Sequence, residues 1–166
     1  MSKEDLGKQE AREKLKHLVE DIRIAMMVTG HDMKPFSAVP MTTKRVDPDG
    51  SIWFLSGKTS EHNRRISRDD RIHLLYSNPS AMEFISISGT GEISEDRNIL
   101  EELYDDTEDQ WFEGPEDSGL TAIRFYPREA FFWDSRTNKY EALYKLGIAA
   151  ISGEDKNKGE KGKLNF

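Results

Sequence analysis

The stretch that decides the fold is residues 35–71, which read PFSAVPMTTKRVDPDGSIWFLSGKTSEHNRRISRDDR. An apolar segment over 36–46 is followed by the turn-forming residues 47–50 and a second apolar segment over 51–56. This order predicts a β-hairpin, and Thr59 or Ser60 then caps a short helix that runs to about Arg68. Pro40 has no N–H for a sheet ladder, so we expect it at a sheet edge, a bulge or a ligand.

The flanking sequence adds further strands and only a few helices. Helical spacing of apolar residues predicts a helix over 4–20, and a nearly unbroken apolar run predicts a buried strand over 22–28. More strands are expected over 71–76, over 84–94 with curvature at Gly89 and Gly91, and over 120–133 as one long or broken strand. Helices are expected over 96–112 and 140–151. Six strand segments with so few helices favour a mainly β fold, a β-barrel with flanking helices.

Composition limits the class of protein. A chain of 166 residues fits one domain, which we place over 1–152, followed by a polar and mobile tail over 153–166 in which Leu164 and Phe166 could dock. The net charge of −7 opposes non-specific binding of nucleic acid, and no apolar run is long enough to cross a membrane. The polar start and the absence of Cys favour a cytoplasmic protein without disulfides or thiolate metal sites.

The segment 58–71 is basic within an acidic chain. It holds five cationic and three acidic side chains, so its local charge is 5 − 3 = +2. Ser56, Gly57, Thr59 and Ser60 precede the expected helix, whose free backbone N–H groups and dipole favour an anion. Two interpretations are open: a phosphate site at the start of the helix, or a solvated helix face with ordinary i,i+4 ion pairs.

Other residues that carry chemistry give weaker signals. His17, His31, His62 and His73 stand at no metal-ligand spacing, so we expect no metal site. The acidic side chains between residues 101 and 109 are typical of a solvated helix face. Trp111, Phe132 and Trp133 suit a ring-binding site, but aromatic residues in barrels usually belong to the core.

Several of these segments together resemble the pyridoxamine 5'-phosphate oxidase-like split barrels that bind FMN, in particular the general stress protein 26-like branch. The matching segments are 36–41 (FSAVPM), 49–54 (DGSIWF), 60–63 (SEHN), 71–76 (RIHLLY), 86–89 (SISG), 111–114 (WFEG), 132–135 (FWDS), 149–153 (AAISG) and 162–164 (GKL). They occur in the right order over nearly the whole chain, which makes the resemblance more specific than any single motif.

The resemblance implies a six-stranded split barrel that forms a homodimer, with FMN bound at the subunit interface. The residues that it assigns to the cofactor are Val39, Pro40, Met41, Thr42, Lys44, Leu55, Ser56, His62, Asn63 and Trp133. Val39 and His62 stand where many relatives carry a phosphate-binding Arg and Lys, so the charge at the phosphate would come from Lys44, Arg64, Arg65 or a protonated His62.

The resemblance also implies a function with alternatives. The first is a flavin-dependent oxidoreductase with an unknown small substrate and a stress-related role, in which the flavin supplies the redox chemistry. Residues 134–139 lack the Arg-Leu-His-Asp-Arg segment of true pyridoxamine phosphate oxidases, so pyridoxamine oxidation is not expected. The second is a non-catalytic protein that stores or senses flavin. The third is a barrel that holds haem or a deazaflavin.

Overall fold

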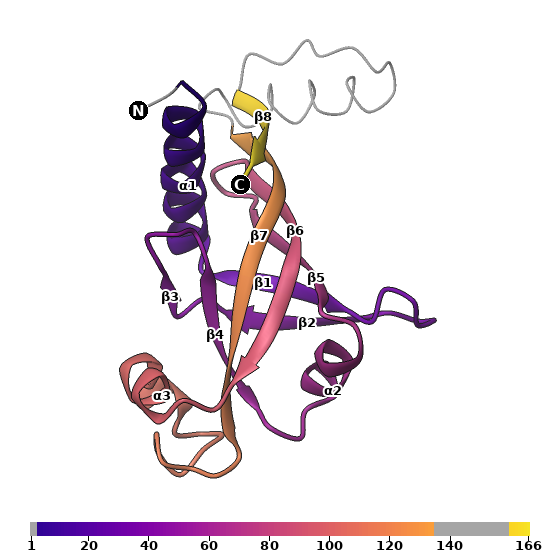
Figure 1. The fold of residues 1–166 in the computed structure, drawn as a ribbon, viewed down its shortest axis with the longest axis vertical. Coiled ribbons are helices and arrows are strands. Elements are labelled where there is room, and N and C mark those ends of the chain that lie inside the picture. Colours follow the sequence, from indigo (N-terminus) through magenta and orange to yellow (C-terminus); the bar gives the residue numbers. More distant parts are fainter. Residues whose placement is uncertain (1–2, 135–159) are drawn as a thin grey trace.

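The computed structural model of the chain describes residues 3–134 and 160–166. The elements follow the order α1 (Lys3–Ile22), β1 (Ile24–Thr29), β2 (Ser37–Thr42), β3 (Arg45–Val46), β4 (Ile52–Gly57), α2 (Glu61–Arg68), β5 (Arg71–Asn78), β6 (Glu83–Ser94), α3 (Arg97–Leu103), the 3-10 turn η1 (Asp106–Glu108), β7 (Leu120–Asp134) and β8 (Glu160–Asn165). Figure 1 shows the long strands β6 and β7 along the length of the molecule, with β1 and β2 crossing them.

The strands form one antiparallel sheet in the order β2-β1-β5-β6-β7-β4-β3, and β8 pairs with the second half of β7. The two ends of this order, β2 and β3, are consecutive in the chain and are joined by Thr43 and Lys44. The Thr43 amide donates to the carbonyl of Arg23, and the Lys44 amide donates to the carbonyl of Trp53. This joint therefore connects the β1 side of the sheet to the β4 side, as a barrel requires.

The long strands bend where Gly89 lies. A register shift between Ser88 and Gly89 interrupts the pairing of β6 with β7. A Cβ atom on Gly89 would lie 2.1 Å from the carbonyl oxygen of Tyr126 on the neighbouring strand. Glycine is therefore required at this position, because the two backbones approach too closely for any side chain.

Two apolar clusters hold the fold together. The larger one fills the barrel and includes Leu15, Leu18 and Val19 of α1, as the helical spacing predicts. Strand β4 belongs to both clusters: Ile52 and Phe54 face the barrel, whereas Trp53 and Leu55 pack with α3 on the other face. Burial on both faces explains why this strand reads as a continuous apolar run.

The predicted mainly β fold is confirmed, but the strand count is higher than six. The segment 36–46 is two strands, and only β3 forms the hairpin with β4, because β2 pairs with β1. The helix expected over 96–112 ends at Leu103 and is followed by η1. The end of the expected mobile tail, residues 160–165, forms β8 against β7, and Phe166 packs against the core. The helix expected over 140–151 lies outside the described residues, and the domain limits stay a prediction.

Candidate functional site

A cleft of about 610 Å³ opens where the ends of β2 and β4 meet the start of α2 and the segment after η1. Seven of the ten predicted cofactor residues line it: Pro40, Met41, Thr42, Lys44, Leu55, Ser56 and His62. The structure therefore brings together residues from β2, the β2–β3 joint, β4 and α2, which are separated by up to 22 positions in the chain, from residue 40 to residue 62.

The three other predicted residues do not line this cleft. Val39 is half-buried and packs against the barrel core. Asn63 is buried beneath the start of α2, where it bonds to Thr121 of β7. Trp133 is half-buried near the end of β7, opposite Phe84 of β6. Their role in binding a cofactor stays a prediction.

The edge position of β2 explains how Pro40 reaches the cleft. Strand β2 stands at one end of the strand order, and Pro40 pairs with Met26 of β1. Side chains of β2 alternate, with Val39 and Met41 packing inward and Pro40 and Thr42 exposed. Of the three positions expected for Pro40, the strand order confirms the sheet edge. An edge strand pairs with one neighbour only, so the missing N–H interrupts no second row of hydrogen bonds.

The Lys44 ammonium group is held by two carboxylates. Its Nζ atom lies 2.5 Å from Asp105 and 2.9 Å from Glu108, and the side chain is only 5% exposed. Burial opposes the charged form, but hydrogen bonds and charge from both carboxylates raise the Lys44 pKa above its ordinary value. Lys44 is therefore a compensated cation, which limits the charge that it can offer to a phosphate.

His62 is a half-buried polar residue of the cleft lining. Its Nε2 atom is buried and has no hydrogen-bond partner among the described residues. Burial lowers the pKa of His62, so the ring is neutral near pH 7. A buried ring nitrogen without a partner costs free energy, so this atom is an unsatisfied group behind the cleft lining.

A buried hydrogen-bond network forms the floor of the cleft at Ser56. The Thr121 hydroxyl lies 2.8 Å from the Ser56 hydroxyl and donates a hydrogen bond to the Ser56 backbone carbonyl at 3.1 Å. It also accepts a hydrogen bond from the side-chain amide of Asn63 at 2.9 Å. All three side chains are less than 5% exposed. Ser56 and Asn63 thus fix β4, β7 and α2 relative to one another.

Five further residues line the cleft that the resemblance did not assign to the cofactor: Ile24, Gly57, Glu108, Trp111 and Phe112. For Trp111 both a ring-binding site and a core position were open; it is 72% exposed and borders the cleft, so it does not belong to the core. Glu108 was expected on a solvated face, yet it is half-buried against Lys44. The aromatic pair was already visible as a matching motif, whereas no spacing indicates a partner 64 residues away from Lys44.

Two absences hold for residues 3–134 and 160–166. No group of three or more His, Asp or Glu side chains comes close enough there to hold a metal ion. No helix in that part of the chain is both long and apolar enough to span a membrane.

Comparisons with known proteins agree with this geometry. The family model for pyridoxamine 5'-phosphate oxidase like proteins matches residues 10–157. Among solved structures, the general stress FMN/FAD binding protein of Xanthomonas citri shares 24% identity at a TM-score of 0.67, covering 78% of this chain and 92% of its own. The general stress protein 26 of Bacillus anthracis shares 18% identity at a TM-score of 0.65, with 73% and 92% covered.

A Clostridium acetobutylicum protein related to general stress protein 26 shares 21% identity at a TM-score of 0.65, covering 78% of this chain and 92% of its own. Among curated proteins, none matches the chain. The likeness to these solved structures concerns the fold, while the family model spans most of the sequence. The protein therefore belongs to the pyridoxamine 5'-phosphate oxidase like family and has the split-barrel fold of the general stress protein 26 structures.

Proposed function

We propose that the cleft binds FMN and that the protein acts as a flavin-dependent oxidoreductase. The observation that carries the proposal is the cleft itself, where seven of the ten residues that the resemblance assigns to the cofactor come together. Support comes from the X. citri neighbour, whose name describes FMN/FAD binding. The names of the neighbours also support a stress-related role.

The walls of the cleft suit a flat aromatic ring. Pro40, Met41 and Leu55 contribute apolar surface on one part of the lining, and Trp111 and Phe112 contribute aromatic surface on another. Sites for organic cofactors are mostly apolar, with a few polar groups that orient the ligand. These side chains would hold the ring system, and the flavin would supply the redox chemistry.

The phosphate end relies on weaker contacts. The Ser60 hydroxyl caps α2 by accepting a hydrogen bond from the backbone N–H of Asn63. The cap does not use the backbone N–H groups of the two preceding residues in the first turn. Together with His62, these amides would hold the phosphate, because Lys44 is already paired and Val39 carries no charge. We expect this arrangement to bind the phosphate less tightly than a site with a free Arg or Lys.

FMN and riboflavin titrations, read by flavin fluorescence, test the site. FMN is expected to bind at micromolar concentration and more tightly than riboflavin, and His62→Gln is expected to narrow the difference between the two ligands. His17→Gln, on the exposed face of α1, is the matched control. The absence of FMN binding at micromolar concentration would refute the proposal. Ser56→Ala and Asn63→Ala are unsuitable variants, because both remove hydrogen bonds within the fold.

The alternative is a protein that stores or senses flavin without turnover. The observation that favours it is the Lys44 group: Lys44 and Glu108 both line the cleft, and their charges are engaged in an ion pair with each other. Stopped-flow reduction of the bound flavin by NADH or NADPH separates the two functions. Reduction by either donor supports the oxidoreductase, and failure of both supports storage or sensing.

We also propose that two copies associate through the exposed face of the sheet, so that FMN lies at the subunit interface. Met26, Leu75 and Phe131 are 40%, 43% and 42% exposed, and the strand register places them in one row across β1, β5, β6 and β7. Large apolar side chains that are exposed in one row of a sheet favour an interaction site. Sedimentation should show a dimer that Leu75→Glu converts to a monomer. A wild-type monomer at tens of micromolar would contradict the shared site.

A further inference from the structure

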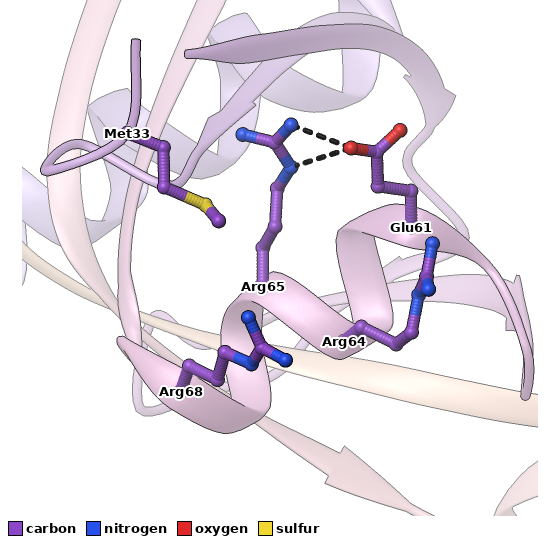
Figure 2. A pocket seen from close by; sticks show the side chains of 5 residues that line it. All are labelled: Met33, Glu61, Arg64, Arg65 and Arg68. Carbon is purple, nitrogen blue, oxygen red and sulfur yellow. Dashed lines mark hydrogen bonds and ion pairs between the residues drawn. The ribbon is translucent and has the colours of Figure 1, made fainter. Parts of the chain in front are cut away.

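A second pocket lies beside α2 and has a basic lining. Glu61, Arg64, Arg65 and Arg68 follow one another at the spacing i, i+3, i+4 and i+7, so they form a single stripe along the helix. Figure 2 shows their side chains on one side of α2, with Met33 of the β1–β2 loop opposite. The pocket between them has a volume of about 130 Å³.

Arg65 is the fixed member of this stripe. Its Nε and Nη2 atoms donate to Glu61 at 3.1 and 2.5 Å, and its side chain is only 14% exposed. The guanidinium packs on Gly30, where a Cβ atom would lie 2.6 Å from Nη1. Nη1 itself is buried and lacks a hydrogen-bond partner among the described residues. The arginine is therefore held in place with part of its hydrogen-bonding capacity unused.

The charges of the stripe are unbalanced. Three guanidinium groups face one carboxylate, so the local charge is 3 − 1 = +2 in a chain with a net charge of −7. Only Arg65 has an ion-pair partner, and neither Arg64 nor Arg68 forms an ion pair within the part of the chain that the structure describes. Like charges at i,i+3 and i,i+4 repel one another on a helix, and an anion between them would remove that repulsion.

We propose that this pocket binds one tetrahedral oxyanion, such as a phosphoryl group, at a site separate from the flavin cleft. The rigid fork of a guanidinium matches phosphate oxygens in a bidentate manner, and neither Arg64 nor Arg68 uses its fork in a hydrogen bond or ion pair with a described residue. A pocket of about 130 Å³ admits a phosphoryl group but not a whole nucleotide.

Helical periodicity separates the two sites. His62 stands one position after Glu61, about 100° around the helix, and it lines the cleft instead of this pocket. Asn63 and Ile66 are buried beneath α2. The helix therefore presents His62 to the cleft and its basic stripe to the second pocket, and an anion in that pocket would bind independently of flavin in the cleft.

The test is a titration of the full chain with inorganic phosphate, followed by amide NMR at residues 61–68 and by calorimetry. A parallel titration with ribose 5-phosphate distinguishes a free phosphate from a phosphoryl group on a small metabolite. Whichever of inorganic phosphate and ribose 5-phosphate binds more tightly, we expect Arg64→Gln and Arg68→Gln each to lower its affinity by roughly tenfold. Lys16→Gln, which removes the same charge from an exposed position of α1, should change nothing.

The variants keep the test informative if one of them folds poorly. Arg64 and Arg68 are exposed, so both substitutions should leave the unfolding transition unchanged. Saturating FMN should leave the phosphate affinity unaltered, and competition between FMN and phosphate would overturn the separate site. Shifts that do not saturate, or that persist in both arginine variants, would show an ordinary solvated basic face and would equally overturn the proposal.

Discussion

The hydroxyl of Thr121 should be worth more to the fold than that of Thr29, although both residues are fully buried threonines on strands. Thr121 makes hydrogen bonds to Ser56 and Asn63, whereas the Thr29 hydroxyl has no partner among the described residues. Substitution by valine changes the same atoms at both positions. The comparison thus isolates the hydrogen bonds that form the floor of the cleft.

The expected changes in the free energy of unfolding follow from the hydrogen-bond partners that each substitution leaves unsatisfied. Thr121→Val leaves the Ser56 hydroxyl and the Asn63 side-chain amide buried without the hydroxyl to which they hydrogen-bond. Each unsatisfied group costs about 1–2 kcal/mol, so we expect the free energy of unfolding to fall by about 2–4 kcal/mol. Thr29→Val removes a hydroxyl that is already unsatisfied, so we expect no loss or a gain of up to about 1 kcal/mol.

Urea unfolding monitored by tryptophan fluorescence measures both changes, provided that the m-value stays constant. A double-mutant cycle adds a second check: Ser56→Ala should cost less in the Thr121→Val background, because its hydroxyl has already lost its partner. Equal effects of the two valine substitutions, or a loss below about 1 kcal/mol for Thr121→Val, would refute the reasoning.

Three further predictions concern the bend, the cleft and its histidine. Gly89→Ala should unfold the protein or cost more than about 3 kcal/mol by thermal melting, because the new Cβ meets the Tyr126 carbonyl; a change below about 1 kcal/mol would contradict this. Asp105→Asn should raise FMN affinity by about two- to fivefold in fluorescence titrations, since Lys44 loses one of two carboxylates; an unchanged affinity would mean that Lys44 does not face the phosphate. The pKa of His62 is lowered in the folded state, so the contribution of His62 to stability is complete above about pH 6.5 and is lost as the pH falls through the folded pKa. His62→Gln should therefore flatten the acidic part of the curve of unfolding free energy against pH. A curve that this substitution leaves unaltered would count against burial as the cause of the lowered pKa.

Much of the fold was predictable because it depends on local signals. The Asp47–Gly50 turn, the Ser60 cap and the helical spacing of α1 and α2 each act within a few residues. The cleft was predictable in part through the resemblance to split barrels, which assigned ten residues of which seven line it. The end of α3 at Leu103 was not predicted, because the acidic residues beyond it keep a helical pattern while their side chains turn to other partners.

Local patterns in the sequence were enough to predict the mainly β class and the basic segment of α2, and they limited Pro40 to an edge, a bulge or a ligand. Period, missing N–H groups and charge are properties of neighbouring residues, which is why they can be read without the fold. Only the tertiary structure decided that Lys44 pairs with Asp105 and Glu108, that Asn63 bonds to Thr121, and that Trp111 is exposed at the cleft. The first three of these contacts join residues 58 to 64 positions apart. Such contacts depend on strand order and register, which no local pattern specifies, and they decide whether a charge on the cleft wall is free to meet a ligand.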